Sequence, residues 1–181
     1  MNNILYIQFE DKNFNIQKRL KQMLPHYIEK SGSKDWIPNI KVVVMKSDKK
    51  LFIDNWIKIR KTLDMENFRN GVLAVDNMYT STDKNIEENN ELKKLLSYIC
   101  EICEEYNLSL LLGCHNKKGT EALRDLISDQ IQGGKTLVNV ATNCLMIHSS
   151  SLSPNLRIAK ILKAGRTGKN ELYKVPFKLR W

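Results

Sequence analysis

Proline and glycine are scarce in this sequence, which has four prolines and eight glycines among its 181 residues. No low-complexity run and no internal repeat interrupts the chain, and 42% of its residues are hydrophobic. These features exclude an intrinsically disordered chain and a repeat array, because both classes leave a compositional or periodic signature. A chain of this length can bury one sizeable core, so we predict a single folded domain over residues 1–181.

Long apolar runs are also missing. No stretch approaches the roughly 20 apolar residues that a membrane-spanning helix needs. The first residues, MNNILYIQFEDK, contain acids and no basic segment ahead of their apolar run, whereas a secretory signal peptide begins with such a basic segment. We therefore predict no signal peptide, no membrane partner and a cytoplasmic location.

Cysteine is sparse, with four residues in the whole chain. Cys100 and Cys103 form a CxxC pair, but the pair lies inside the helical pattern SYICEICEEY and no second pair accompanies it. One such pair supplies only half of a four-ligand zinc site. We therefore predict reduced thiols that pack on apolar faces, without a redox or metal-binding role.

A complete phosphate-binding loop is absent as well. The stretch QIQGGKT (130–136) ends in the Gly-Lys-Thr triplet of the GxxxxGK[ST] motif, but Asp129 occupies the position of the first glycine. A carboxylate there would repel phosphate, and the preceding EALRDLISDQ has a helical pattern where the loop requires a strand. The triplet is therefore not expected to work as a phosphate loop.

Basic residues outnumber acids and give a net charge of +9, which is concentrated late in the chain. Residues 115–181 hold 12 Lys and Arg against four Asp and Glu, whereas residues 1–114 hold 17 against 16. A basic C-terminal third favours a phosphate-bearing partner, either a nucleotide or a nucleic acid. The alternative is a lysine-rich solvated surface, and charge alone does not separate the two.

Hydrophobic periodicity predicts an alternation of strands and helices. Short apolar runs typical of buried strands alternate with segments whose apolar residues recur every three or four positions. The predicted strands are 4–10, 41–46, 71–76 and 108–115, the predicted helices are 14–30, 52–63, 88–107 and 120–131, and three C-terminal strands follow at 143–149, 157–164 and 171–181. This order predicts an α/β fold with a mostly parallel sheet covered on both faces and closed at one edge by antiparallel C-terminal strands.

Polar, chemically capable side chains follow three of the predicted parallel strands. Open parallel sheets bind ligands at the carboxyl ends of their strands, so these positions are the first candidates for a site. They are Glu10 and Asp11, Asp76 and Asn77, and His115 and Asn116. We predict that Glu10, Asp76 and His115 converge on one pocket at a shared edge of the sheet.

Four apolar residues followed by an acid, VLAVD ending at Asp76, resemble a Walker B strand, whose carboxylate holds the water shell of Mg²⁺. Before it, LYIQFED and IQKRL resemble the strand and arginine-bearing helix that follow the phosphate-loop helix in RecA-like ATPases. After it, the run from VDNMYT to GCHNKK resembles the mobile loop, helix and His-containing strand, and QGGKTLVNVATNCLMI with RIAKILKAGRTGKNELYKVPFKL resembles the post-sensor loop and closing strands. The chain thus resembles RecA-like P-loop ATPases of the RepA and DnaB helicase type, AAA family ATPases of bacterial mobile elements, over the portion C-terminal to the P-loop.

The resemblance implies a RecA-like three-layer αβα fold that lacks the P-loop strand and helix. That strand lies centrally in the usual sheet, so either the remaining strands close ranks or an apolar seam stays open and invites self-association. Without the Walker A loop, the chain alone is expected to bind ATP and Mg²⁺ poorly, because phosphoryl transfer depends on positioning and charge neutralisation.

The resemblance also implies roles at the predicted pocket. Glu10 would be the general base that polarises the attacking water, and Asp76 would hold Mg²⁺ through water, with Asn77 beside it in the nucleotide site. His115 would be the sensor of the γ-phosphate. The alternatives are that Glu10 and Asp11 cap the following helix, as acids near a helix N-terminus often do, and that His115 is an ordinary histidine at a strand end.

Basic residues would act between subunits and on nucleic acid. Arg166, with Lys163 behind it, would present charge to the nucleotide of a neighbouring subunit, as an arginine finger does. Lys117 and Lys118 would contact nucleic acid. Lys135, in the loop after the sensor strand, would contact nucleic acid or help to order that loop. The alternative for Arg166 is a solvated cation in a hairpin turn.

Three functions follow from these features. In the first, the full-length form assembles into a ring or other homo-oligomer and uses ATP and Mg²⁺ to unwind DNA or replicate a plasmid or mobile element. In the second, the chain is a non-catalytic, degenerate RecA-like module that binds nucleic acid or a partner ATPase through its basic C-terminal third. The third is an unrelated α/β enzyme that uses Asp76 and His115.

Overall fold

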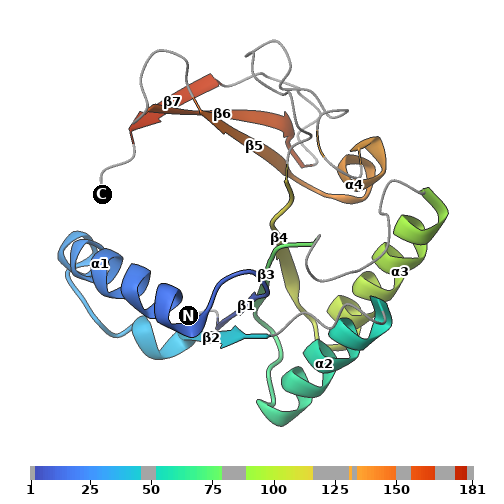
Figure 1. The fold of residues 1–181 in the computed structure, drawn as a ribbon, viewed down its shortest axis with the longest axis horizontal. Helices are drawn as coiled ribbons and strands as arrows, with labels where there is room; N and C mark the ends of the chain where they lie inside the picture. Colours follow the sequence, from blue (N-terminus) through green and yellow to red (C-terminus); the bar gives the residue numbers. More distant parts are fainter. Residues whose placement is uncertain are drawn as a thin grey trace. The chain divides into compact units, whose positions relative to one another are not determined.

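The computed structural model describes residues 3–45, 52–78, 89–115, 131, 134–149, 156–165 and 174–178 (Figure 1). They belong to two compact units, one made of Met1–Asn85 with Lys94–Cys114 and one made of Ile86–Lys93 with His115–Trp181. The single domain expected over the whole chain stays a prediction. The helix predicted over residues 120–131 lies outside the described residues, apart from Ile131.

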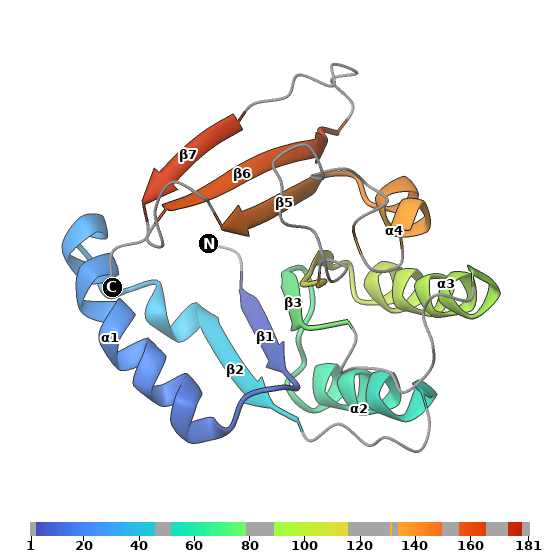
Figure 2. The same cartoon turned by 45° about the horizontal axis from the view of Figure 1, so that its top comes forward.

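Parallel strands form the centre of the first unit (Figure 2). The strands are β1 (Ile4–Gln8), β2 (Ile40–Val44), β3 (Val72–Asp76) and β4 (Ser109–Leu112), and they pair in the order β2-β1-β3-β4. Every neighbouring pair is parallel, so the predicted mostly parallel sheet is confirmed. β3 pairs directly with β4. Whether the strands close ranks around the absent P-loop strand or leave an apolar seam stays a prediction.

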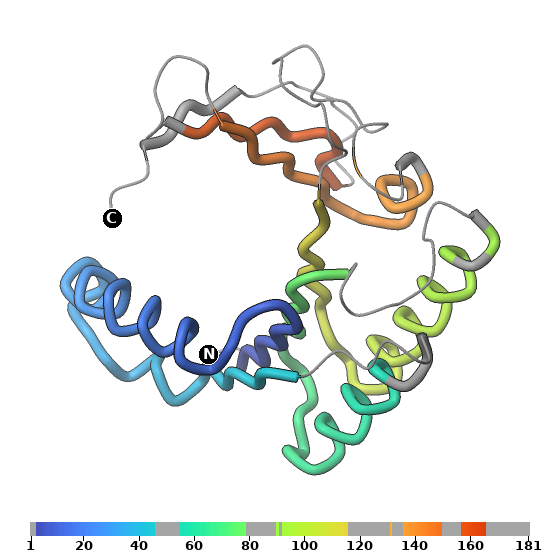
Figure 3. The backbone as a smooth tube through the Cα atoms, in the orientation of Figure 1, coloured from blue at the N-terminus to red at the C-terminus, as the bar shows by residue number. Residues whose placement is uncertain are grey.

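Helices cover both faces of this sheet, so the predicted αβα layering is confirmed. α1 (Asn13–Ser31) lies on one face, and α2 (Phe52–Met65) and α3 (Asn89–Glu105) lie on the other (Figures 2 and 3). The chain moves one way along the sheet from β1 to β2 and the opposite way from β2 to β3 and on to β4. Right-handed crossovers in opposite directions place their helices on opposite faces. None of the helices in the described ranges is long and apolar enough to cross a membrane.

The most buried side chains of the first unit come from one face of the sheet and from α2 and α3. On α2, Trp56, Ile59 and Leu63 recur every three or four residues and are fully buried, as their spacing predicts. The buried residues of the strands alternate, as one face of a sheet requires: Leu5 and Ile7 on β1, and Leu73 and Val75 on β3, with Leu95, Ile99 and Ile102 facing the core from α3.

α1 is packed less closely than its apolar pattern predicts. Of the apolar positions at helical spacing, only Ile16 is buried, and the Met23 side chain is 46% exposed. On β1, Tyr6 and Gln8 alternate with the core residues and therefore lie on the opposite face of the sheet. Polar side chains on that face leave α1 less apolar surface to cover.

Antiparallel strands form the sheet of the second unit. β5 (Cys144–Ser149) pairs with β6 (Leu156–Lys163), and β6 pairs with β7 (Lys174–Lys178). The antiparallel pairing is confirmed, and the connections are shorter than the dozen or more residues that a parallel crossover needs. The prediction that these strands close the edge of the parallel sheet is wrong, because the described strands form two separate sheets. β6 is paired on both sides, so its backbone groups are satisfied within the antiparallel sheet.

A short helix, α4 (Gly134–Val140), precedes β5. The prediction of a loop at Lys135 is therefore wrong, because this residue lies in the first turn of α4. Leu137 is buried, and its carbonyl accepts a hydrogen bond from the Ala141 N–H at 2.9 Å. Burial of Leu137 stabilises this helix, which the glycines at its start made difficult to predict from the sequence.

The four cysteines are free thiols, and none of them is buried. Cys100 is exposed on α3, so the prediction of a thiol packed on an apolar face is wrong there. Ile99 and Ile102 face the core, and each further residue turns a helix by about 100°. Cys100 is thereby carried round to the solvent side, while Cys103 is half-buried.

Cys103 is expected to react slowly with iodoacetamide. Burial raises the pKa of its thiol to about 11 from the ordinary 9.0, with smaller contributions from Cys100 and Glu104. At pH 8, the folded chain therefore holds about a hundredfold less Cys103 thiolate than the unfolded chain. Because a thiolate of higher pKa is a better nucleophile, part of this loss is offset, and we expect labelling about tenfold slower than in the unfolded chain. Peptide mass spectrometry after timed labelling at pH 8, with and without urea, measures the two rates. Equal rates at Cys103 in both states would contradict the burial of its thiol.

Candidate functional site

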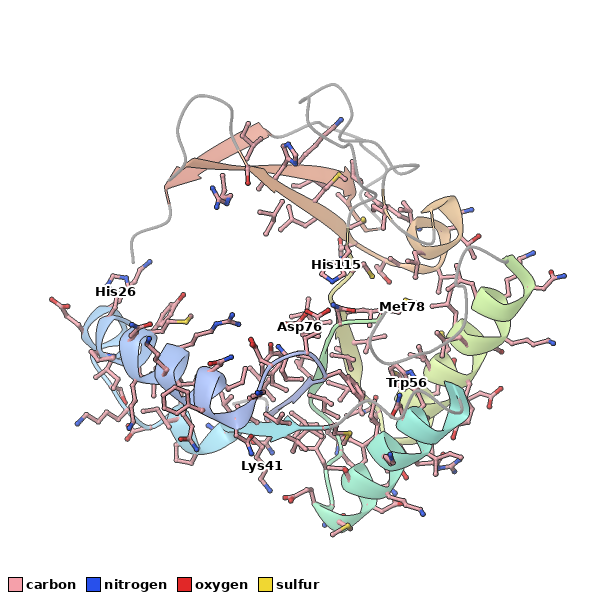
Figure 4. All side chains as sticks on the ribbon, viewed as in Figure 1. His26, Lys41, Trp56, Asp76, Met78 and His115 are labelled. Atoms are coloured by element: carbon pink, nitrogen blue, oxygen red, sulfur yellow. The ribbon has the colours of Figure 1, made fainter. Side chains whose placement is uncertain are left out.

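The carboxyl ends of β1 and β3 lie side by side and bring two of the predicted acids to one edge of the sheet. Gln8 is the register partner of Asp76, and the Phe9 N–H donates to the Asp76 carbonyl at 2.9 Å. Figure 4 shows Asp76 at the end of β3. We call the group formed by Tyr6, Gln8, Glu10, Asp76 and Asn77 the carboxylate edge.

The Asp76 carboxylate is held by two neutral donors. The Tyr6 hydroxyl donates to Asp76 Oδ2 at 2.8 Å, and the Gln8 amide Nε2 donates to the same oxygen at 2.9 Å. Gln8 Nε2 also donates to the Tyr6 hydroxyl oxygen at 3.1 Å, which closes a triangle of hydrogen bonds. Tyr6 and Gln8 are two positions apart on one strand, so both side chains reach the same face as Asp76.

Glu10 is tied to the same group by two further hydrogen bonds. Its backbone N–H donates to Gln8 Oε1 at 3.0 Å, and its carboxylate Oε1 accepts from Asn77 Nδ2 at 2.5 Å. The Gln8 and Asn77 side chains are each 1% exposed, whereas Glu10 is exposed. The buried amides of Gln8 and Asn77 therefore hold the backbone N–H and the carboxylate of the exposed Glu10.

The pKa of Tyr6 is raised well above its ordinary value of 10.0, first by burial and then by its hydrogen bond to Asp76 and the charge of that carboxylate. Each of these effects disfavours a phenolate beside an ionised acid. Tyr6 therefore keeps its proton throughout the physiological range. It remains a hydrogen-bond donor to Asp76.

The residues around Asp76 fit a magnesium ion bound through water. Carboxylate and amide oxygens are hard ligands of the kind that Mg²⁺ prefers. A side chain at Gly113 would place its Cβ 3.2 Å from Asp76 Oδ1, so glycine leaves room at the second carboxylate oxygen. Within the described ranges, no three His, Cys, Asp or Glu side chains gather as a metal cluster, and a water-mediated contact to Asp76 requires only one carboxylate.

The alternative of a helix cap is not realised by Glu10. The N-cap of α1 is Lys12, and no side chain caps that helix end. Asp11 instead accepts from Asn15 Nδ2 at 3.2 Å and pairs with Arg19 at 2.5 Å. Glu10 and Asp11 are thus neighbours in sequence with separate partners, since Asp11 bonds to α1.

His115 is the third residue after the end of β4 and is exposed. It is the residue at which the chain enters the second unit. Its position at the carboxyl end of a parallel strand matches the expected order of elements. Its role as a sensor stays a prediction.

The basic residues predicted to act on nucleotide or nucleic acid belong to the second unit. Lys163 donates through Nζ to the carbonyls of Val138 at 3.0 Å and Asn139 at 2.9 Å, in the last turn of α4. A cation at a helix C-terminus accepts no bond itself but donates to the unpaired carbonyls there and interacts favourably with the helix dipole. Lys163 therefore has a structural role, and its nucleotide-binding role stays a prediction. Of the other predicted cations, Arg166, Lys117 and Lys118 lie outside the described residues, and Lys135 is described only in its backbone.

Three residues of this region were not expected from the sequence: Tyr6, Gln8 and Gly113. Gln8 offered one signal, because a fully polar amide stands inside the otherwise apolar strand that precedes Glu10. Buried polar groups are nearly always hydrogen-bonded, so such an amide implies a partner. Nothing in the sequence identifies that partner as Asp76, which is 68 residues away.

Comparison with known proteins identifies the family of this chain. A family model described as an AAA domain matches residues 2–121 of this chain, which is more than half of its length. The matched region contains β1 to β4 and the whole carboxylate edge, and it ends before α4. No curated protein matches the chain. The acids at neighbouring strand ends and the family match agree, and the chain belongs to the AAA domain family of ATPase-like proteins.

Proposed function

We propose that this AAA domain is the part of a RecA-like ATPase of the RepA and DnaB helicase type that follows the phosphate loop. Its full-length form couples ATP hydrolysis to DNA unwinding in the replication of a plasmid or mobile element. The observation that carries this proposal is the carboxylate edge, where Asp76 and Glu10 stand at adjacent strand ends. One buried amide, Gln8, contacts both residues.

Each acid of the carboxylate edge has surroundings suited to a different task. Asp76 is half-buried and held by two neutral donors, which suits an orienting role toward a cation's water shell. Glu10 is exposed, and Asn77 directs its carboxylate, which leaves an acceptor at the surface for a proton from water. When bound, Mg²⁺ supplies neutralisation of the phosphate charges. His115 follows the neighbouring strand as the proposed sensor.

The experiment that tests this function is ATP hydrolysis by the form of the protein that includes the coding sequence upstream of Met1. Asp76→Asn is expected to lower turnover by about 10–100-fold, because the amide cannot orient the cation's water shell as a carboxylate does. Asp35→Asn, a change of an exposed acid in the turn after α1, serves as the matched control. Full turnover in Asp76→Asn would show that the Walker B assignment is wrong.

We also propose DNA as a partner of the basic C-terminal third and a homo-oligomer in which Arg166 reaches a neighbouring subunit's nucleotide. The concentration of positive charge in residues 115–181 supports both parts of this proposal. The same charge favours the non-catalytic alternative, a degenerate module that binds nucleic acid or a partner ATPase. The two differ in whether ATP hydrolysis depends on Asp76.

DNA affinity is expected to fall steeply as salt rises. If three lysines or arginines contact a single strand, log K should fall with log salt with a slope of roughly −2, because bound counterions are released. Fluorescence anisotropy of a labelled oligonucleotide at several salt concentrations measures the slope. Replacing Lys117 and Lys118 together by glutamine should make the slope shallower, whereas the same change at Lys18 and Lys21 of α1 removes equal charge as a control. Equal effects of both pairs would show that binding is not local to the C-terminal third.

A further inference from the structure

Two side chains that carry no charge converge on one oxygen of Asp76. The Tyr6 hydroxyl and the Gln8 amide both donate to Oδ2, at 2.8 and 2.9 Å. Among the described residues, no hydrogen bond is formed to Oδ1 of the same carboxylate. The two oxygens of Asp76 are thus chemically distinct, since one is saturated by protein donors and the other faces the space left by Gly113.

This arrangement opposes rotation of the carboxylate. Turning the Asp76 side chain would remove both donors from Oδ2. It would leave one N–H of the buried Gln8 amide without its carboxylate acceptor, since the other N–H donates to the Tyr6 hydroxyl. An unsatisfied buried donor costs about 1–3 kcal/mol, which is enough to confine the side chain to one orientation. Oδ1 is therefore presented in a constant direction.

The orientation of the Gln8 amide is itself fixed from its other end. Its Oε1 accepts the Glu10 backbone N–H at 3.0 Å, so only one amide orientation satisfies both ends. Reversing the amide would set its NH₂ group against that N–H and its oxygen against the Asp76 carboxylate. A single buried side chain thereby links the backbone of Glu10 to the carboxylate of Asp76.

We propose that Gln8 and Tyr6 are positioning residues, which hold Asp76 with Oδ1 directed at the water shell of a divalent cation and set its placement relative to Glu10. The inference rests on the proposed function, because it assigns these two residues to the metal-binding acid of the same site. Neither residue touches the reacting atoms. Their effect passes through Asp76 and through the backbone of Glu10.

Mn²⁺ is titrated into the chain up to millimolar concentration, because the chain alone is expected to bind divalent cations weakly. NMR of tyrosines labelled with ¹³C at Cζ follows its binding and tests the proposal. Tyr6→Phe assigns the Tyr6 resonance, which Mn²⁺ at Asp76 broadens, while the resonance of Tyr27 on α1 stays sharp. Gln8→Met keeps the length of the side chain but removes all three hydrogen bonds of the amide. It should require about tenfold more Mn²⁺ for the same broadening, as loss of a group that orients a metal ligand typically does. Gln17→Met on the exposed side of α1 is the matched control.

A second measurement keeps the test independent of the Gln8 variant's folding. Water-proton relaxation gives the Mn²⁺ affinity of Tyr6→Phe, which should also weaken about tenfold. A Mn²⁺ affinity of Tyr6→Phe equal to that of the unsubstituted chain would overturn the positioning role of Tyr6.

The outcomes separate this inference from the proposed function. If Asp76→Asn abolishes Mn²⁺ binding but Gln8→Met and Tyr6→Phe bind as tightly as the unsubstituted chain, the positioning role is wrong and the metal role of Asp76 stands. If Mn²⁺ does not broaden Tyr6 in the unsubstituted chain, the metal role of Asp76 fails and the positioning role fails with it. Weaker Mn²⁺ binding in Gln8→Met and Tyr6→Phe, with unchanged binding in Gln17→Met, supports the proposal.

Discussion

Glu10→Gln should lower ATP turnover by about 10²–10⁴-fold, the range typical of losing a general base, in the form of the protein that includes the coding sequence upstream of Met1. Glutamine retains an amide oxygen that can accept the hydrogen bond from Asn77 Nδ2, so the side chain keeps its place. It cannot accept a proton from water at neutral pH. We therefore expect kcat to fall while nucleotide affinity changes little.

Steady-state hydrolysis and nucleotide binding, measured on the same preparations, separate these two effects. Glu29→Gln, at an exposed position on α1, removes one carboxylate without touching the carboxylate edge and is the matched control. Glu10→Ala should lose turnover to a similar extent, because both variants lack the base. Turnover within twofold of the unsubstituted protein in Glu10→Gln would rule out Glu10 as the general base and would leave its proximity to Asp76 without a catalytic role.

Trp56→Ala should destabilise the chain by about 3–5 kcal/mol, the usual cost of deleting a large aromatic side chain from a core. Trp56 is fully buried on α2 beside Ile59 and Leu63 in the helical repeat. Its indole Nε1 is buried and has no hydrogen-bond partner among the described residues. The side chain therefore stabilises the fold by packing rather than by a hydrogen bond.

That distinction predicts a smaller cost for Trp56→Phe, about 1–2 kcal/mol, because phenylalanine loses volume but no hydrogen bond. Urea unfolding followed by circular dichroism measures both variants. Trp36→Phe provides the contrast, since the indole of half-buried Trp36 donates to Ser31 Oγ at 3.0 Å and to the Ser33 carbonyl at 2.8 Å. A cost below about 1 kcal/mol for Trp56→Ala would be incompatible with a tryptophan in a close-packed core.

Much of the first unit followed from local sequence patterns. The β-branched and apolar runs that became β1 to β3 and the helical spacing of α2 and α3 were evident, because both periodicities arise from residues close in the chain. The placement of Glu10 and Asp76 at one sheet edge also followed, since parallel strands joined by helices bring their carboxyl ends together. The second unit was less predictable. α4 was not expected, because Gly133 precedes it and Gly134 begins it. The separate antiparallel sheet required knowing which strands pair.

The sequence by itself determined the alternation of strands and helices, the positions of the two acids at strand ends and the family to which the chain belongs. Only the tertiary structure decided that Tyr6 and Gln8 bind Asp76 and that Gly113 adjoins its other oxygen. The reason is the register of the sheet: Gln8 lies opposite Asp76 only because β1 and β3 are neighbours aligned at that residue. A slip of one position would turn Gln8 to the other face, and no local pattern fixes a pairing between residues so far apart in the chain.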